Sequence, residues 1–168
     1  MEWAGCAEPY PSFLVWDGKI LRPQSGFWNR RSSPSNLNIP AYVLDAHALY
    51  WYWSQPALLG TDAQLVFRQL EVQAAVGFVP TIVLFEIDSL LRRRHQPQTM
   101  MGLVDLVEQS PALRLEPLSR DHLVASNQLS DLVEIHDRII AAAALVNNAT
   151  LVTRDTALRR HPLLQTAW

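Results

Sequence analysis

Short apolar runs alternate with helical segments through residues 41–168, and this alternation is the feature that most restricts the fold. Neighbouring parallel strands need a crossover connection, usually a helix, so repetition of this kind is typical of a parallel sheet covered by helices. We therefore predict a parallel α/β sandwich. The expected strands are residues 42–44, 78–84, 113–118 and Thr150–Val152, with residues 163–168 as a further edge strand.

The segments between these strands carry helix start and stop signals. A helix capped by Thr61 or Asp62 is expected to run to Val76, with Gly77 as its stop signal. The helix after the second strand is expected to hold Glu86 in its first turn and to end at the arginines 92–94. The remaining helices are expected between residues 45 and 56, between 101 and 110, over 120–129, from about residue 137 through the alanines 141–144, and over 158–160.

The 168 residues suffice for one domain with a sizeable core. Residues 1–40 differ from the rest because they are rich in proline and serine, contain three tryptophans and sustain no periodicity. We interpret them as an N-terminal arm or linker that is partly disordered, with short pieces able to pack on the body. The predicted domain is residues 41–168.

Composition excludes several classes of protein. The formal net charge of -2 argues against nucleic-acid binding by bulk electrostatics alone. No apolar run is long enough to span a bilayer, so no membrane association is expected. The single cysteine, Cys6, cannot form an internal disulfide, and the N-terminus lacks the basic start of a secretory signal. A cytoplasmic location is therefore the simplest expectation.

Four acidic residues stand where a strand-like run ends or a helix is about to begin. They are Asp45, Glu86, Asp137 and Asp155. Because the carboxyl ends of parallel strands share one edge of a sheet, where ligands of open α/β folds bind, we expect the four to converge there. The alternative for each acid taken singly is that it caps its helix or interacts with the helix dipole.

Converging carboxylates would require a divalent cation. Mg²⁺ and Mn²⁺ prefer oxygen ligands, and Mg²⁺ usually takes one or two protein carboxylates and keeps several waters. Such ions acidify a bound water and neutralise charge on phosphate, so a site of acids alone can support phosphodiester cleavage.

The residues around the acids resemble a known family. The stretches are YVLDAHALYWYW around Asp45, VPTIVLFEI ending near Glu86, EIHDRIIAAAAL around Asp137 and TLVTRD ending at Asp155. In order and spacing they resemble the PIN domain, especially the toxin ribonucleases called VapC. The resemblance covers residues 41–168, and the first forty residues match nothing in it.

The resemblance implies a three-layer α/β/α sandwich, with a central, mainly parallel sheet of four to five strands, and a Mg²⁺- or Mn²⁺-dependent endoribonuclease. Asp45, Asp137 and Asp155 would hold metal directly or through water, and Glu86 would complete the site or orient the attacking water. Thr153 would support the site by hydrogen bonding, and Glu134 would keep a further carboxylate nearby. Where many relatives have a serine before the glutamate, this chain has Val83.

The resemblance also implies partners. The chain would be the toxin of a type II toxin-antitoxin system, would act on RNA, would form a homodimer and would bind an antitoxin protein across an apolar groove near the active site. The aromatic residues 51–53 are interpreted mainly as packing for the core or for such an interface, with base stacking as the alternative.

Several basic residues are candidates for RNA phosphate contacts. Arg138 and Arg154 stand directly beside proposed ligands, although each can instead pair with an acid. Arg92 and Arg93 can follow an RNA backbone or simply interact with the C-terminal end of the helix dipole. His47 is expected to make a structural hydrogen bond, and His136 stands too far from other histidines and cysteines in the sequence to suggest zinc.

Two rival functions are weighed against the nuclease. An aspartyl-phosphate phosphatase also places an aspartate after its first strand, but it usually has a second aspartate two residues on, where this chain has His47. A catalytically silent PIN module acting in binding or assembly is the other rival. The presence of all four acids argues against it.

Overall fold

The structure, a computed structural model, describes residues 15–16, 19–20, 39–96 and 98–168. Its centre is a sheet of five parallel strands in the order β5-β4-β3-β6-β7. The strands are β3 (Ala41–Leu44), β4 (Val76–Pro80), β5 (Leu113–Glu116), β6 (Thr150–Val152) and β7 (Thr166–Ala167). The predicted parallel α/β architecture is therefore confirmed.

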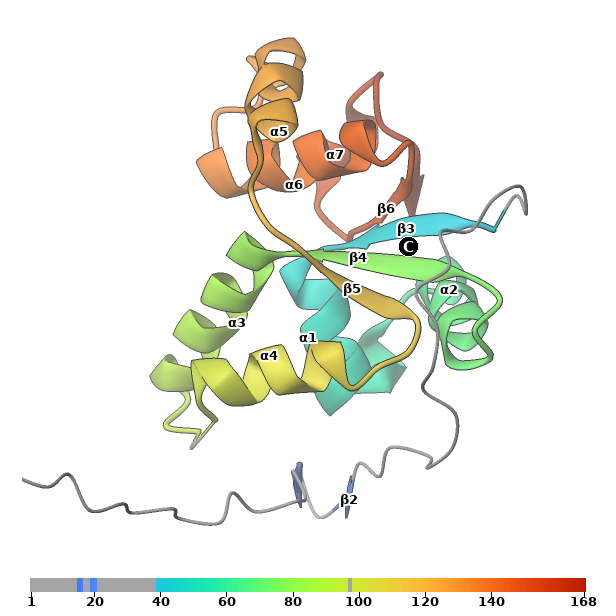
Figure 1. The fold of residues 1–168 in the computed structure, drawn as a ribbon, viewed down its shortest axis with the longest axis vertical. Helices are drawn as coiled ribbons and strands as arrows, with labels where there is room; N and C mark the ends of the chain where they lie inside the picture. The colour runs from blue at the N-terminus through green and yellow to red at the C-terminus, as the bar shows by residue number, and fades with distance from the viewer. Residues whose placement is uncertain (1–14, 17–18, 21–38, 97) are drawn as a thin grey trace, which may run out of the picture.

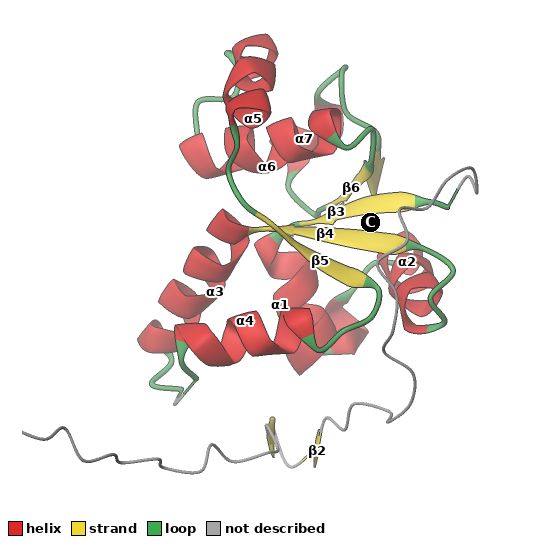
Figure 2. Ribbon diagram, viewed as in Figure 1, coloured by secondary structure: helices red, strands yellow, loops and turns green. Residues whose placement is uncertain are grey.

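Helices cover both faces of the sheet (Figure 1). On one side lie α1 (Ala46–Ser54), α3 (Thr81–Arg93) and α4 (Met100–Glu108), with α2 (Thr61–Glu71) beside them, and on the other lie α5 (Arg120–Ala125), α6 (Ile135–Val146) and α7 (Thr156–Arg160). The sheet thus forms the middle of three layers (Figure 2). Two 3-10 turns complete the described body, η1 (Pro56–Leu58) and η2 (Ser126–Leu129).

The core lies between the sheet and its helices because the central strands bury side chains on both faces. Val43 and Leu44 on β3 are fully buried, as are Leu151 and Val152 on β6. On α6 the buried positions include the alanines 141–144, whose small side chains allow the helix to lie close to the sheet. This close packing brings the N-terminal end of α6 to the carboxyl edge of the strands.

The structure corrects the second predicted strand and the helices on either side of it. β4 ends at Pro80 and α3 begins at Thr81, so Glu86 lies in the second turn of α3 and not in its first. The apolar residues after Pro80 form the buried face of a helix, and a short apolar run does not distinguish this from a strand. Similarly, α2 ends at Glu71, well before Val76, which belongs to β4.

Smaller differences concern element ends. The strand expected over residues 113–118 ends at Glu116, the edge strand expected over residues 163–168 comprises only β7, and the helix expected over residues 120–129 is α5 followed by η2. Within the described residues, no helix has the length and apolar character needed to cross a membrane.

The predicted arm, residues 1–40, lies mostly outside the described residues. Its described pieces are β1 (Val15–Trp16) and β2 (Lys19–Ile20), which pair antiparallel with each other. The division into an arm and a domain at residue 41 therefore stays a prediction.

Candidate metal centre

Asp45 and Asp155 follow neighbouring strands of the sheet. β3 pairs with β6 in parallel, with Leu44 opposite Val152, and the backbone N–H of Asp45 donates to the carbonyl of Val152 at 3.1 Å. Asp45 is the N-cap residue of α1 and Asp155 that of α7. The register of two adjacent strands therefore places both acids at one edge.

Thr153 connects these two acids. Its hydroxyl donates to Oδ2 of Asp45 at 2.6 Å and accepts from the backbone N–H of Asp155 at 3.0 Å. Thr153 is fully buried and Asp45 is 7% exposed, so the short hydrogen bond lies out of solvent. Its geometry is that of a charge-assisted bond to a carboxylate.

Helix capping accounts for one of the two strand-end acids and not for the other. Oδ1 of Asp155 accepts from the N–H groups of Ala157 and Leu158, at 2.7 and 3.1 Å, as an N-cap side chain does. Asp45 makes no capping hydrogen bond with its side chain. Its carboxylate is instead held at the edge by Thr153.

Glu86 and Asp137 approach from helices on opposite faces of the sheet. Glu86 lies on α3 and Asp137 in the first turn of α6. Between them stands His136, whose Nδ1 lies 2.9 Å from Oε1 of Glu86. Glu134 caps α6, its Oε2 accepting from the backbone N–H of His136 at 2.7 Å.

The pKa values of three of these acids are raised, chiefly by burial and in part by the neighbouring carboxylates. Burial raises the pKa of Glu86 to about 7, and the negative charges of Asp45, Asp137 and Glu134 add to the effect while His136 opposes it. Burial also raises the pKa of Asp137 to about 6, with contributions from Asp155, Asp45 and Glu134.

The pKa of Asp45 is raised for the same reasons. Burial is the main cause and the charge of Asp155 a smaller one, while the Thr153 hydrogen bond and His47 favour the ionised form. All four predicted acids thus act electrostatically within one region. Carboxylates that are part-buried and mutually repelling are an arrangement that a cation would relieve.

The donor chemistry fits a hard divalent cation such as Mg²⁺ or Mn²⁺. Across the described ranges, no three carboxylate, histidine or cysteine side chains come close enough together to hold an ion jointly. Mg²⁺ does not need such a cage, because it binds through one or two carboxylates and keeps several waters. The part-exposed Asp137 and Asp155 leave the site open to solvent and substrate.

The candidate arginines differ in their distance from these acids. Arg154 adjoins Asp155, and its guanidinium lies 4.6 Å from the ring centroid of Trp51. Arg138 follows Asp137 on α6 and is half-buried. Arg92 and Arg93 lie in the last turn of α3, about 10 Å beyond Glu86 along the helix axis, and Arg92 pairs with Asp88 at 2.7 Å.

Sequence reasoning did not identify His136 as a member of this site. Its contact with Glu86 joins two helices that are fifty residues apart in the chain, and no local pattern reveals such a pair. His47 is exposed and meets the ring of Trp51 edge-on at 5.8 Å. Val83 is fully buried on α3.

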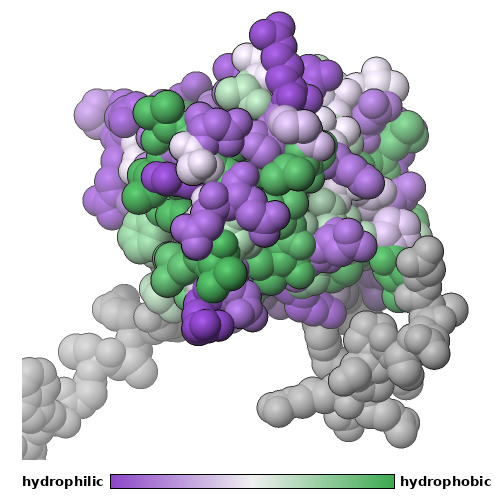
Figure 3. Space-filling model, turned by 90° about the horizontal axis from the view of Figure 1, so that it is seen from above, coloured by the Kyte–Doolittle hydropathy of each residue, from purple (hydrophilic) through white to green (hydrophobic). Residues whose placement is uncertain are grey.

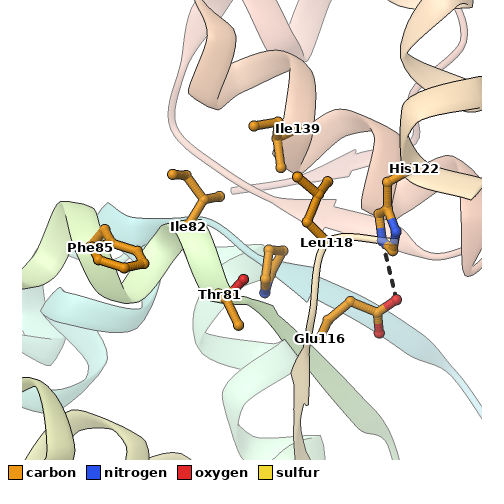
Figure 4. Close-up of a pocket in the computed structure, with 8 residues that line it drawn as sticks. Thr81, Ile82, Phe85, Glu116, Leu118, His122 and Ile139 are labelled. Atoms are coloured by element: carbon orange, nitrogen blue, oxygen red, sulfur yellow. Dashed lines mark ion pairs between the residues drawn. The ribbon is translucent and has the colours of Figure 1, made fainter. Parts of the chain in front are cut away.

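An apolar cavity of about 190 Å³ adjoins the site between α3, the segment after β5, α5 and α6. Phe85, Leu118 and Ile139 contribute apolar side chains, and His122 faces Glu116 at 3.2 Å (Figure 4). Phe85 is 60% exposed and directly precedes Glu86. Seen from above Figure 1, the surface carries apolar patches set among polar side chains (Figure 3).

Solved structures of toxin-antitoxin complexes share this fold. VapBC2 from Rickettsia felis, bound to a DNA fragment from its promoter, has a TM-score of 0.57 at 18% identity and covers 75% of this chain and 96% of its own. VapBC-1 from nontypeable Haemophilus influenzae has a TM-score of 0.52 at 18% identity, and the match covers 75% of this chain and 96% of that one. A toxin-antitoxin complex from Klebsiella pneumoniae has a TM-score of 0.52 at 17% identity, and the match covers 73% of this chain and 94% of that one.

Comparison with curated proteins gives no match. The family model described as the PIN domain matches residues 42–163, which is most of the chain and includes all four acids. The resemblance noted in the sequence is therefore confirmed, and the chain belongs to the PIN domain family.

Proposed function

We propose that the protein is a Mg²⁺- or Mn²⁺-dependent endoribonuclease. The observation that supports this most strongly is the mutual perturbation of Asp45, Glu86 and Asp137, together with Asp155, at one edge of the sheet. Acids that only capped helices would have no reason to converge from four elements on one edge of the sheet. Membership of the PIN family is consistent with this chemistry.

Each acid has a distinct proposed role. Asp45, Asp137 and Asp155 would hold the ion directly or through water, with Asp45 fixed by Thr153. When bound, the ion would supply charge neutralisation at the phosphate and a more acidic water. Glu86 would complete the site, or orient the attacking water and accept its proton. In-line attack at phosphorus would leave a 5′-phosphate and a 3′-hydroxyl.

We propose further that the protein is the toxin of a type II toxin-antitoxin pair, acting in the cytoplasm and forming a homodimer. The similar folds in complexes titled VapBC support an antitoxin partner. The apolar cavity beside Phe85 offers a docking place next to Glu86, where an antitoxin segment would block access to the acids. Arg138 and Arg154 are the proposed phosphate contacts nearest the site, and Arg92 and Arg93 would lie farther along the RNA.

The test is cleavage of single-stranded RNA by wild type, Asp45→Asn and Asp137→Asn with Mg²⁺, Mn²⁺ or EDTA. Each substitution and EDTA should lower the rate by roughly 100-fold or more, because each removes charge stabilisation worth several kcal/mol. Asp105→Asn, an exposed acid on α4, is the matched control and should cleave normally.

Cleavage that survives both substitutions or EDTA would refute the proposed site. A folded wild type that cleaves no RNA across a broad panel would instead favour the catalytically silent PIN module. The toxin assignment is tested separately by co-expression with the product of a small neighbouring reading frame, which should abolish cleavage and form a stable complex.

A further inference from the structure

An aromatic and cationic cluster, formed by His47, Trp51, Arg154 and Trp168, lies beside the acids. Trp51 is its centre: the Arg154 guanidinium lies over its ring at 4.6 Å, Trp168 meets it at 5.6 Å with the planes tilted by 53°, and His47 meets it edge-on at 5.8 Å. These residues come from α1, the loop after β6 and the end of the chain. The hydrogen bonds that hold Asp45 and Asp155 do not involve this cluster.

The fold builds the cluster from adjacent elements. His47 and Trp51 are four residues apart on α1 and so share one face of the helix. The backbone N–H of Thr153 donates to the carbonyl of Ala167 at 3.2 Å, which ties Trp168 to the strand that leads to Arg154. Trp168 packs closely on Gly60: a Cβ atom added to Gly60 would lie 2.8 Å from the Cδ1 atom of Trp168.

Two residues of the cluster are close neighbours, in the sequence, of two of the proposed acids. His47 lies two residues after Asp45, in the first turn of the helix that Asp45 precedes, and Arg154 immediately precedes Asp155. His47 and Arg154 are exposed, while the two tryptophans are half-buried. A group bound at this cluster would therefore lie next to a phosphate placed at the acids.

We propose that the cluster is a stacking subsite for an unpaired nucleobase adjacent to the scissile phosphate. The guanidinium of Arg154, which lies over the ring of Trp51, and the two half-buried tryptophan rings provide π surface and positive charge. This combination binds bases of single strands with little sequence preference. Bases within a duplex are stacked and unavailable, so the subsite selects single-stranded RNA or an extruded nucleotide. The inference rests on the proposed function for the identity of the ligand as RNA.

Packing of the C-terminal segment on α1 is the competing explanation for the same contacts. It accounts for Trp168 against Trp51, but it gives no role to an exposed arginine and an exposed histidine on the same ring. The two explanations differ in what they predict. Packing alone makes Trp51 matter for stability, whereas the subsite makes it matter for affinity toward strands that carry bases.

The experiment measures binding in EDTA, so that cleavage does not interfere. Fluorescence anisotropy gives the Kd of a labelled single-stranded oligoribonucleotide of about ten nucleotides, and of the same strand with abasic residues. Trp51→Leu should weaken binding of the first strand about ten-fold or more, while wild type should bind the abasic strand about as weakly as the variant does. Trp51→Phe should restore most of the affinity, because phenylalanine retains a stacking face.

The matched control is Trp53→Leu, a half-buried tryptophan of the same helix that is outside the cluster. It should bind RNA like wild type. If Trp51→Leu does not fold, Arg154→Lys replaces it, because Arg154 is exposed and the substitution keeps the positive charge while removing the planar guanidinium. Arg154→Lys should weaken binding of the strand with bases about three-fold or more.

The proposal is overturned if wild type binds neither strand, if the abasic strand binds as tightly as the strand with bases, or if Trp51→Leu binds like Trp53→Leu. Adding Mg²⁺ to the same samples separates the two proposals. Base-dependent binding without cleavage would leave the subsite standing and the nuclease refuted. Cleavage by wild type, together with unchanged binding by Trp51→Leu, would support the nuclease and overturn the subsite.

Discussion

The candidate metal centre has two halves that are built differently. In the strand-end half, Asp45 and Asp155 are joined by the Thr153 hydroxyl at 2.6 and 3.0 Å, and Asp155 also caps α7. In the helix half, Glu86 and Asp137 extend from α3 and α6, and His136 is the basic side chain that contacts Glu86. The first half is held by hydrogen bonds from Thr153 and from the start of α7. In the second half burial raises the pKa values most, and repulsion between the carboxylates adds to the effect.

The difference indicates how a site of acids can fold before a cation binds. Hydrogen bonds offset part of the cost of burying Asp45, although its pKa is still raised. In the helix half, His136 contacts Glu86 at 2.9 Å, yet the pKa of Glu86 reaches about 7 and that of Asp137 about 6, both chiefly because of burial. We infer that protons neutralise this half below about pH 6 in the absence of a cation and that a cation would replace them.

Removing the bridging hydroxyl should have the largest effect on stability. Thr153→Val leaves the buried carboxylate of Asp45 without its donor, and we expect the free energy of unfolding at pH 8 to fall by about 2 kcal/mol, since hydrogen bonds to charged groups contribute about 1.5–3 kcal/mol. Urea unfolding measures the change. Thr150→Val, at a half-buried position on the same strand, is the control. Equal costs for the two variants would show that the strand-end half does not depend on the bridge.

The helix half should make the metal-free protein less stable as pH rises. The pKa values of Glu86 and Asp137 in the folded protein, about 7 and about 6, exceed their ordinary values of 4.5 and 3.8. The folded state therefore binds more protons than the unfolded state between about pH 4 and 7, and the free energy of unfolding falls across that window. Allowing for solvent screening of these part-exposed groups, we expect a loss of about 1–2 kcal/mol.

Thermal or urea unfolding in EDTA at pH 5 and pH 8 measures this loss. The double variant Glu86→Gln/Asp137→Asn should remove most of it, because neither amide titrates. Adding Mg²⁺ to wild type should raise stability more at pH 8 than at pH 5. A variant that retained the full pH dependence would place its origin outside the helix half.

Neutralising one acid in each half should change stability in opposite directions. Asp137→Asn should raise the free energy of unfolding at pH 8 in EDTA by about 1 kcal/mol, because it removes the cost of burying a charge and the repulsion from the neighbouring acids, which together outweigh the favourable helix-dipole interaction. Asp155→Ala should lower it by about 1 kcal/mol, because two backbone N–H groups lose their acceptor. Changes of the same sign would mean that the two halves do not differ as described.

The strand-end half was the more predictable of the two from sequence. Asp45 and Asp155 follow apolar runs that end in the structure where they end in the sequence, at Leu44 and Val152. Once the strands are taken as parallel, their common edge follows from chain geometry. The bridge by Thr153 was a hypothesis from family resemblance, because residues 45 and 153 are 108 positions apart.

The helix half was harder to predict, for a physical reason. Residues 78–85 are almost continuously apolar, and burial on both a strand and the following helix produces the same composition. The division at Pro80 is set by tertiary packing, and the error displaced Glu86 from the second turn of α3 to the first. The contact of Glu86 with His136 depends on how α3 and α6 meet, which no local pattern contains.

The smallest expected effect concerns His136, the basic group that moderates the helix half. His136 lowers the pKa of Glu86, so His136→Gln should raise that pKa further above about 7, by an amount equivalent to a few tenths of a kcal/mol because the pair is part-exposed. Carbon-13 NMR of the Glu86 carboxyl measures the shift, and the rising limb of the cleavage pH profile should move the same way. His95→Asn is the matched control, because His95 is exposed beyond the end of α3 and is not among the groups that shift the pKa of Glu86, and it should leave the Glu86 titration unchanged. An unchanged titration in His136→Gln would mean that the 2.9 Å contact carries no charge in solution, and that the helix half is moderated by solvent alone.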